Sequence, residues 1–329
     1  MGYLSGSGGL SLDLRSQQCP GCGLSGPQIF RETFRDPYFG QDYRLFECSQ
    51  CGLQYWEPRR IIPEFYEKAY LREYRARHEG RLKRLKYYHL EFFKNFARFS
   101  GVRPRLLDVG CGNGLFLKQA RERGFEPWGI DLDQYSVRFA SEKLGLSRVL
   151  ALDLAGFFQK AQQENWRFEF ITAFEVLEHQ DHLKDFLDRV FRLLVPGGFF
   201  VGTVPNRENF FRMEHPGSFV DYPPNHFFRF NQQSLKILLE KAGFEKVVVY
   251  DIREPFYKYL KNLEKFTWQK VVRAPKNVGG NYKRIVKIFR FFRALCLRPV
   301  LLFPALILRE RISYPVLYFQ AQKTRGSDG

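Results

Sequence analysis

The middle of the chain alternates between two patterns of apolar and polar positions. Short apolar runs, such as RLLDVG at 105–110 and FEFITAFE at 168–175, predict strands. Segments with apolar residues three and four positions apart predict the helices, which lie at 115–124, 134–144, 156–164, 181–194 and 232–242. This alternation, which closes on a last strand at 314–323, predicts an α/β fold with a doubly wound sheet. Ligands of such sheets bind beyond the carboxyl ends of the strands.

Two segments flank this alternation. Residues 61–104 carry a helical pattern, which predicts leading helices before the first strand of the sheet. Residues 253–311 interrupt the alternation before the last strand, and within them 281–298 predicts a basic amphipathic helix. Its apolar face holds Ile285, Ile288, Phe289, Phe292 and Leu295, and its basic face holds Lys283, Lys287, Arg290 and Arg293. Such a helix suits either a lid over a pocket or a contact with a membrane interface.

The charge of the chain is unevenly distributed. The 329 residues have a formal net charge of +17, with +12 in residues 253–311 and +9 in residues 59–105. This concentration favours an acidic partner, either phosphate or an anionic membrane, and solubility alone is the alternative. No apolar run approaches the roughly 20 residues that span a bilayer. We therefore expect a cytoplasmic protein, for which residues 281–308 offer a peripheral contact with the inner face of the cell membrane.

Four of the six cysteines form two CxxC pairs, CPGCG at 19–23 and CSQCG at 48–52. Two such pairs allow four thiolates to converge tetrahedrally, and the glycine after each pair permits a tight turn. A redox role needs only one CxxC beside a βαβ unit, so two pairs favour structural zinc. We predict a zinc ribbon over residues 16–60, after a flexible tail at 1–15. The predicted ligands are Cys19, Cys22, Cys48 and Cys51.

The first strand of the sheet runs directly into a glycine-rich turn and then a helix. Gly110, Gly112 and Gly114 form GxGxG, which is neither the GxGxxG of dinucleotide sites nor a P-loop. Asp131 ends the second strand about twenty residues later, where a carboxylate can accept both hydroxyls of a ribose. Asp153 ends the third strand, within reach of a purine amino group. These residues predict a ligand made of adenosine joined to something other than phosphate.

The segments LLDVGCGNG, GID, ALD, FEVLEH and LLVPGGFFVGTVPN, in this order, resemble the class I S-adenosylmethionine-dependent methyltransferases over 105–250 and the final strand. The resemblance implies a Rossmann-like methyltransferase sheet within 61–252 and 312–325, and S-adenosylmethionine as the cofactor. It also implies that Asp131 holds the ribose and that Asp153 faces the adenine. The implied contacts of the methionine part are Asp108, Gly110, Gly112 and Gly114, and those bordering the sulfonium are Phe174 and Glu175.

The amino-terminal part resembles a narrower subgroup. CPGCG, YRLFECSQCGLQYWEPRR and the Tyr-rich FYEKAYLREY are similar to the zinc ribbon and following helix of methyltransferases found among bacterial polysaccharide and cell-envelope genes. This resemblance implies O-methylation of a small or lipid-linked, sugar-containing envelope intermediate. Two other functions stay open. One is an RNA methyltransferase whose ribbon and basic segments bind phosphates, and the other is a zinc-dependent scaffold that binds the cofactor without turnover.

Methylation of a hydroxyl group requires removal of its proton, and histidine is suited to this role near neutral pH. His226, in the aromatic stretch YPPNHFFRFN, and His179, after the fourth strand, are the predicted general bases, with Tyr222 as a further candidate. His179 has a second interpretation, as a residue that caps the turn and packs against the cofactor loop. Glu175, Glu178 and His179 also match the ExxEH pattern, which the resemblance to quinone-biosynthesis O-methyltransferases associates with a divalent cation.

Overall fold

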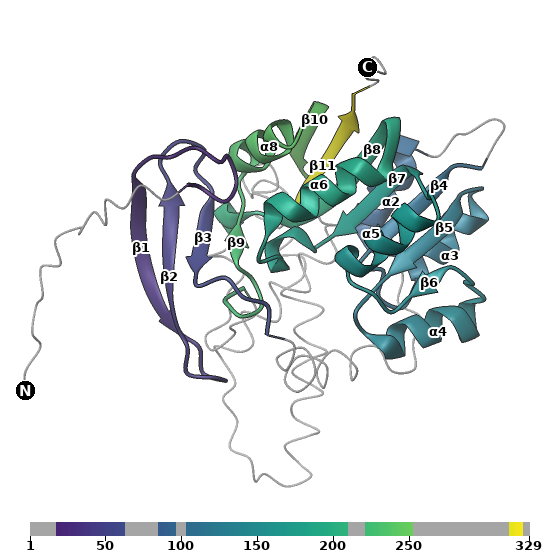
Figure 1. Cartoon of the computed structure of the whole chain (residues 1–329), viewed down its shortest axis with the longest axis horizontal. Helices are drawn as coiled ribbons and strands as arrows, with labels where there is room; N and C mark the ends of the chain where they lie inside the picture. Colours follow the sequence, from purple (N-terminus) through teal and green to yellow (C-terminus); the bar gives the residue numbers. More distant parts are fainter. Residues whose placement is uncertain (1–17, 63–84, 97–102, 210–220, 253–315, 325–329) are drawn as a thin grey trace, which may run out of the picture. The chain divides into compact units, whose positions relative to one another are not determined.

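The computed structural model in Figure 1 describes residues 18–62, 85–96, 103–209, 221–252 and 316–324. The chain divides into two compact units, residues 1–252 with 315–329 and residues 253–314. The second unit lies outside the described residues. The predicted tail at 1–15, most of the leading helices and the amphipathic helix at 281–298 lie outside them as well. Within the described part of the chain, no helix is long and apolar enough to cross a membrane.

A seven-stranded sheet forms the centre of the first unit. Its order is β10–β11–β8–β7–β4–β5–β6, in which β8, β7, β4, β5 and β6 pair in parallel and β11 is antiparallel to both its neighbours. The strands are β4 (Arg105–Val109), β5 (Glu126–Ile130), β6 (Val149–Leu150), β7 (Phe168–Phe174), β8 (Leu194–Pro205), β10 (Phe244–Asp251) and β11 (Val316–Lys323). The predicted α/β, Rossmann-like fold is confirmed. The insertion of β11 between β8 and β10 makes the sheet mixed.

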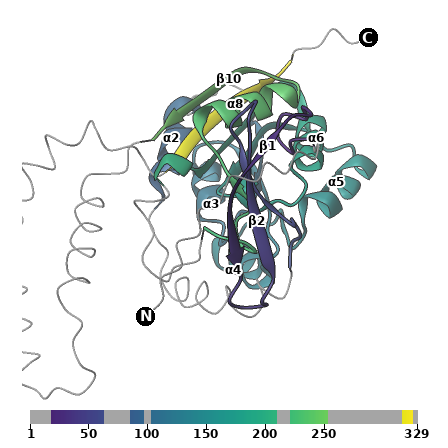
Figure 2. The same cartoon turned by 90° about the vertical axis from the view of Figure 1, so that its left-hand side faces the viewer.

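Helices cover both faces of this sheet, because successive strand residues point to opposite sides. In β4, Leu106 packs into a core shared with α2, α3 and α4, and Leu107 packs into a core shared with α5, α6 and α8. Figure 2 shows α2 and α3 on one side of the sheet and α5 and α6 on the other. The helices are α2 (Tyr87–Phe96), α3 (Leu115–Glu122), α4 (Gln134–Leu144), α5 (Leu154–Gln163), α6 (Leu183–Leu193) and α8 (Gln232–Lys241).

Side-chain caps fix where the helices after β5, β6 and β9 begin. The carboxylate of Asp133 accepts from the backbone amides of Tyr135 and Ser136, at the start of α4. Asn231 and Ser234 form a reciprocal capping box at the start of α8. Because caps satisfy amides that have no partner inside a helix, they define the first residue of each of these helices.

A second, four-stranded sheet contains the amino-terminal residues. Its order is β1–β2–β3–β9, and all its pairs are antiparallel. The strands are β1 (Gln28–Arg35), β2 (Asp42–Cys48), β3 (Gln54–Glu57) and β9 (Phe228–Arg229). The fourth strand therefore comes from the segment that precedes α8, as Figure 1 shows. The next residue, Phe230, forms a bridge with Asn206 at the end of β8, so one short segment joins the two sheets.

Candidate active site and metal centre

Two matching turns carry the four predicted zinc ligands. In the first turn the amide of Gly23 donates to the carbonyl of Cys19 at 2.9 Å, and in the second the amide of Gly52 donates to the carbonyl of Cys48 at 2.8 Å. Gly23 has φ +73° and Gly52 has φ +72°, a left-handed conformation that glycine adopts without steric cost. The sequence CxxCG therefore folds into the same turn twice.

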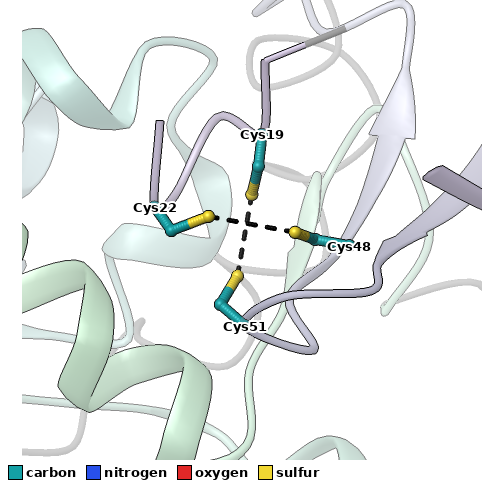
Figure 3. Close-up of side chains that lie close together, drawn as sticks. All are labelled: Cys19, Cys22, Cys48 and Cys51. Carbon is teal, nitrogen blue, oxygen red and sulfur yellow. Dashed lines mark hydrogen bonds between the residues drawn. The ribbon is translucent and has the colours of Figure 1, made fainter. Parts of the chain in front are cut away.

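The two turns bring all four sulfur atoms to one point, as Figure 3 shows. The Sγ atoms of Cys19 and Cys51 are 3.7 Å apart, and those of Cys22 and Cys48 are 3.9 Å apart. Thiolates bound tetrahedrally at about 2.3 Å from zinc lie about 3.8 Å from one another, whereas sulfurs in a disulfide are about 2.05 Å apart. The cluster therefore has the dimensions of a four-cysteine zinc site.

The electrostatics of the cluster also fit a bound cation. All four cysteines are buried free thiols. Burial raises the pKa of Cys22 to about 11, and the hydrogen bond with Cys51, with burial, raises the pKa of Cys19. Four buried thiols cannot ionise together without a compensating positive charge, and zinc supplies that charge. Zinc at this site stays a prediction that the donor set fits.

The glycine turn after β4 folds onto the end of β5. The amides of Gly110 and Cys111 both donate to the carbonyl of Ile130, at 2.8 and 3.0 Å. Gly110 has φ +75°, and a Cβ placed there would lie 2.8 Å from Cγ2 of Val176. A side chain at this position would clash with the segment after β7, so only glycine lets the turn sit there. Backbone at this turn is thus available for close approach to a ligand.

Asp131 closes the turn from the end of β5. Its Oδ2 accepts from the amide of Gly112 at 2.7 Å, and its Oδ1 accepts from the amide of Asp133 at 2.8 Å. Burial raises the pKa of Asp131 above its ordinary value, although these two hydrogen bonds oppose the shift. Each carboxylate oxygen has a second lone pair, so hydroxyl groups of a ribose can still be accepted. The exposed Asp153 instead caps α5, where its Oδ1 accepts from the amide of Gly156 at 2.7 Å.

Asp108 lies in β4, buried immediately before the glycine turn. Its Oδ1 accepts a hydrogen bond of 2.7 Å from Oγ1 of Thr172. Burial raises the pKa of Asp108 to about 8, against the opposing effect of that hydrogen bond. The carboxyl group is therefore largely protonated at neutral pH in the folded protein.

Asp108 should make folding stability fall as the pH rises. In the unfolded chain an aspartate has a pKa of about 3.9. Between about pH 4 and 8 the folded state therefore binds the proton of Asp108 more tightly than the unfolded state does. As the pH rises through this range, the free energy of unfolding should fall by up to about 1.4 kcal/mol per pH unit because of this one group. Replacing Asp108 by asparagine should remove this loss. We expect Asp108→Asn to melt at a higher temperature than the wild type at pH 8.5 and at a similar temperature at pH 4.5. Melting curves that stay parallel across this range would contradict the assignment.

An aromatic cluster borders the other side of the turn. The ring of Phe174, at the end of β7, stacks on Tyr88 of α2 with centroids 5.5 Å apart and meets Phe116 of α3 edge-on at 5.0 Å. Burial raises the pKa of Tyr88 well above its ordinary value. Sequence reasoning did not single out Tyr88. The only signal for it is its place in the aromatic run YYH at 87–89, just before the sheet begins.

The ExxEH residues follow β7 and are held under strain. Glu175 has φ +59°, an uncommon conformation for a residue with a side chain, and its amide donates to the carbonyl of Thr203 at 2.9 Å. Glu178 is fully buried, and neither of its carboxylate oxygens has a hydrogen-bond partner among the described residues. Burial raises the pKa of Glu178 well above its ordinary value. The ionised form of Glu178 would therefore need a positively charged partner in this interior.

The two predicted histidine bases meet in this interior. The rings of His179 and His226 lie edge to face with centroids 4.5 Å apart. Nδ1 of His179 donates to the carbonyl of Asn225 at 2.7 Å, because a carbonyl oxygen can only accept. Burial lowers the pKa of His179 to about 3. The ring is therefore neutral at pH 7, with its lone pair on Nε2.

His226 is oriented by a carboxylate that sequence reasoning missed. Its Nδ1 lies 3.1 Å from Oδ1 of Asp221, and both belong to one tight turn in which the amide of His226 donates to the carbonyl of Tyr222. Burial alone would raise the pKa of Asp221, but the hydrogen bond with His226 holds it below its ordinary value. Asp221 thus stays ionised beside the ring. The third candidate base, Tyr222, packs its ring against Phe34, with centroids 4.5 Å apart.

Comparison with known proteins now identifies the family. The family described as "Methyltransferase domain" matches residues 78–249, which is more than half of the chain and includes the glycine turn and the histidine cluster. The chain belongs to this methyltransferase family. The predicted class I methyltransferase relationship is confirmed, and it supports S-adenosylmethionine as the cofactor. The family match does not test the role of any single site residue.

Individual curated relatives are similar to only part of this chain. The ubiquinone biosynthesis O-methyltransferase of Psychrobacter cryohalolentis is 33% identical over 106 residues, covering 31% of this chain and 41% of that protein. A probable S-adenosylmethionine-dependent methyltransferase of Mycolicibacterium smegmatis is 29% identical over 141 residues, which cover 43% of this chain and 51% of that protein. The chain thus spans about half or less of the length of these curated relatives. A SAM-dependent methyltransferase structure from Archaeoglobus fulgidus matches 71% of this chain and 92% of its own, with 19% identity and a TM-score of 0.44.

Proposed function

We propose that the protein transfers a methyl group from S-adenosylmethionine to a hydroxyl oxygen of a small or lipid-linked, sugar-containing intermediate of the cell envelope. The observation that carries the proposal is the junction of two features at the carboxyl ends of β4, β5 and β7. One is the glycine turn closed by Asp131, and the other is the pair of adjacent imidazole rings of His179 and His226. Oxygen as the acceptor atom agrees with the relatives that are named O-methyltransferases.

The residues of this chain perform the transfer mainly by positioning. When bound, S-adenosylmethionine supplies a methyl group that its sulfonium makes electrophilic. The turn at Gly110–Gly114 would hold the methionine part and the carboxylate of Asp131 would hold the ribose, while Phe174 and Glu175 would border the sulfonium. The O–CH₃ bond forms as the S–CH₃ bond breaks, so holding both partners in line supplies most of the rate acceleration.

The proton of the acceptor hydroxyl goes to His226. Its Nδ1 is engaged by Asp221, so Nε2 carries the lone pair that takes the proton as the new bond forms. The ionised carboxylate of Asp221 stabilises the imidazolium and fixes the orientation of the ring. The products are then a methyl ether, S-adenosylhomocysteine and a proton on His226. Removal of one such base typically lowers the rate by about 10²–10⁴-fold.

The envelope acceptor rests on the resemblance of the amino-terminal ribbon to that of envelope-gene methyltransferases. We place the protein in the cytoplasm, with a peripheral contact through residues 281–308 at the inner face of the membrane, where lipid-linked sugars are assembled. That segment lies outside the described residues. The RNA and scaffold alternatives gain no support from the geometry of the described residues.

Labelled methyl transfer into fractionated cell extract tests this proposal. We expect label from S-adenosylmethionine to enter a glycolipid or soluble sugar fraction and to resist mild alkali, as a methyl ether does and a methyl ester does not. His226→Ala should lose this label and keep its affinity for S-adenosylhomocysteine. Label found in RNA would contradict the acceptor proposed here, and no label in any fraction would favour the scaffold.

The same two histidines, together with Glu178, could instead bind a divalent cation. One donor atom each from Glu178, His179 and His226 lies within 4.8 Å of the others, which suits a divalent cation. This set differs from the ExxEH set that the sequence suggested, because His226 takes part and Glu175 is not in the group. Two imidazoles and one carboxylate are a common ligand set for transition metals. The two roles exclude each other, since one Nε2 lone pair cannot both bind a metal and take a proton.

Metal content decides between the two roles. Cobalt bound by four thiolates gives an intense sulfur-to-metal absorption, whereas cobalt bound by histidine and carboxylate does not. If His226 is the base, we expect one metal ion per chain, with the thiolate signature alone. A second ion without that signature, lost in Glu178→Gln while the thiolate signal persists, would assign the cluster to a cation.

A further inference from the structure

The segment that carries His226 is buried in a way that loops rarely are. Residues 223–230 are buried without a break, yet only Phe228 and Arg229 belong to a strand. A buried loop must find partners for its backbone groups, or it pays a large desolvation cost. The question is which part of the fold supplies them.

The amino-terminal sheet supplies partners on one side. Tyr55 and Phe228 are paired in the β3–β9 ladder, and the amide of Trp56 donates to the carbonyl of Phe227 at 2.9 Å. The active-site side supplies the next partner, because the amide of Phe227 donates to the carbonyl of Glu178 at 2.7 Å. The backbone of one residue, Phe227, therefore links β3 directly to the ExxEH segment.

Side chains of the same sheet hold the start of the segment. The ring of Tyr222 lies 4.5 Å from Phe34 of β1 and 5.7 Å from Trp56 of β3, centroid to centroid. The guanidinium of Arg229 lies 5.1 Å from the Trp56 ring and 5.0 Å from the Tyr222 ring, and it pairs with Glu32 of β1 at 3.0 Å. Because Tyr222 provides the carbonyl that accepts from the amide of His226, its anchoring fixes the base.

The cysteine turn itself reaches the same region. Cys48 ends β2, and the carbonyl of Gly52, in the turn before β3, accepts a hydrogen bond from the guanidinium of Arg207. The amide of Arg207 donates in turn to the carbonyl of Phe230 at 2.8 Å. A continuous set of contacts thus runs from the cysteine turn through Arg207 to the carboxyl end of the segment.

We infer that the cysteine-bearing sheet is a structural wall of the acceptor site, in which Phe34 and Trp56 act as positioning residues that hold the 221–230 segment and its Asp221–His226 pair in place. This inference rests on the proposed function for its catalytic meaning. Among the described residues, the backbone amides of the cofactor turn at 110–114 donate to β5, to Asp131 and within the turn, and not to the amino-terminal sheet. Loosening the sheet should therefore disturb the base and spare cofactor binding.

Hydrogen–deuterium exchange on the full chain, loaded with zinc and S-adenosylhomocysteine, tests the inference without needing the acceptor. Phe34→Ala removes a half-buried ring that contacts Tyr222. Phe30→Ala is the matched control, because it removes another half-buried ring from the same strand, one whose described ring partner is Phe46. We expect amides at 225–230 to exchange about tenfold faster or more in Phe34→Ala only. Phe34→Tyr keeps the ring and should restore the wild-type rate.

Each outcome of this experiment either supports or overturns the positioning role of the amino-terminal sheet. Unchanged exchange at 225–230 in a folded Phe34→Ala, or equal acceleration in both alanine variants, would overturn the inference. If Phe34→Ala loses its zinc and the sheet unfolds, the 221–230 segment should be released with it, and protection that persists there would also overturn it. Failure of the proposed function would be seen separately, because the wild-type protein would then not bind S-adenosylhomocysteine.

Discussion

Replacing Asp131 by alanine is expected to weaken the affinity for S-adenosylhomocysteine by about 100-fold or more, since charge-assisted hydrogen bonds contribute about 1.5–3 kcal/mol each. The carboxylate has two tasks in this structure. It holds the glycine turn through the amide of Gly112, and its remaining lone pairs are predicted to accept the hydroxyls of a ribose. Both tasks are lost with the side chain. Titration calorimetry of the purified protein measures the change.

Asp133→Ala is the control for this substitution. Asp133 stands two residues away, and its carboxylate caps α4 through the amides of Tyr135 and Ser136 without contacting the glycine turn. Loss of the cap should reduce stability by about 1 kcal/mol and leave the affinity nearly unchanged. If both variants lose the same affinity for S-adenosylhomocysteine, the carboxylate of Asp131 does not bind the ligand directly.

Replacing Cys48 by serine should reduce the zinc content from one ion per chain to nearly none. Structural zinc sites of this kind bind with apparent free energies of about 10–16 kcal/mol at pH 7, and that binding energy is available to folding. Cys48 ends β2 and leads into the turn before β3, so the amino-terminal sheet should become less stable. Elemental analysis and the thermal unfolding of the variant measure both effects.

Cys111→Ser provides the comparison for this loss. Cys111 is also a buried free thiol, but it lies in the glycine turn and outside the group of four cysteines. This variant should keep its zinc. Full zinc content in Cys48→Ser, or wild-type protein that binds no zinc after refolding with the metal, would refute the assignment of the cluster.

Much of the central sheet could be predicted because its signals are local. Apolar runs mark β4, β5, β7 and β8, and the helices α3, α4 and α6 follow β4, β5 and β7 closely in sequence. The position of Asp131 directly after β5 could be predicted in the same way, and its contact with a ribose stays a prediction. The third predicted strand, at 148–153, forms only as Val149–Leu150, because Asp153 is taken as the cap of α5.

What the sequence could not predict depends on contacts between distant parts of the chain. The strand β9 has two residues, Phe228 and Arg229, which is too short for any periodic pattern. Its place beside β3 becomes visible only in the folded chain. Asp221 is similar, because nothing in its neighbours marks it until a tight turn brings it against His226. Tyr222 lies in a stretch that suggested a base, and its ring packs on Phe34.

We expect the turn at 110–114, closed by Asp131, to bind adenosine joined to a sulfonium amino acid. Titration calorimetry with S-adenosylhomocysteine, and with NAD as the comparison ligand, measures this binding. One molecule of S-adenosylhomocysteine should bind per chain, and NAD should show no measurable binding. Saturable binding of NAD with no heat from S-adenosylhomocysteine would contradict this expectation.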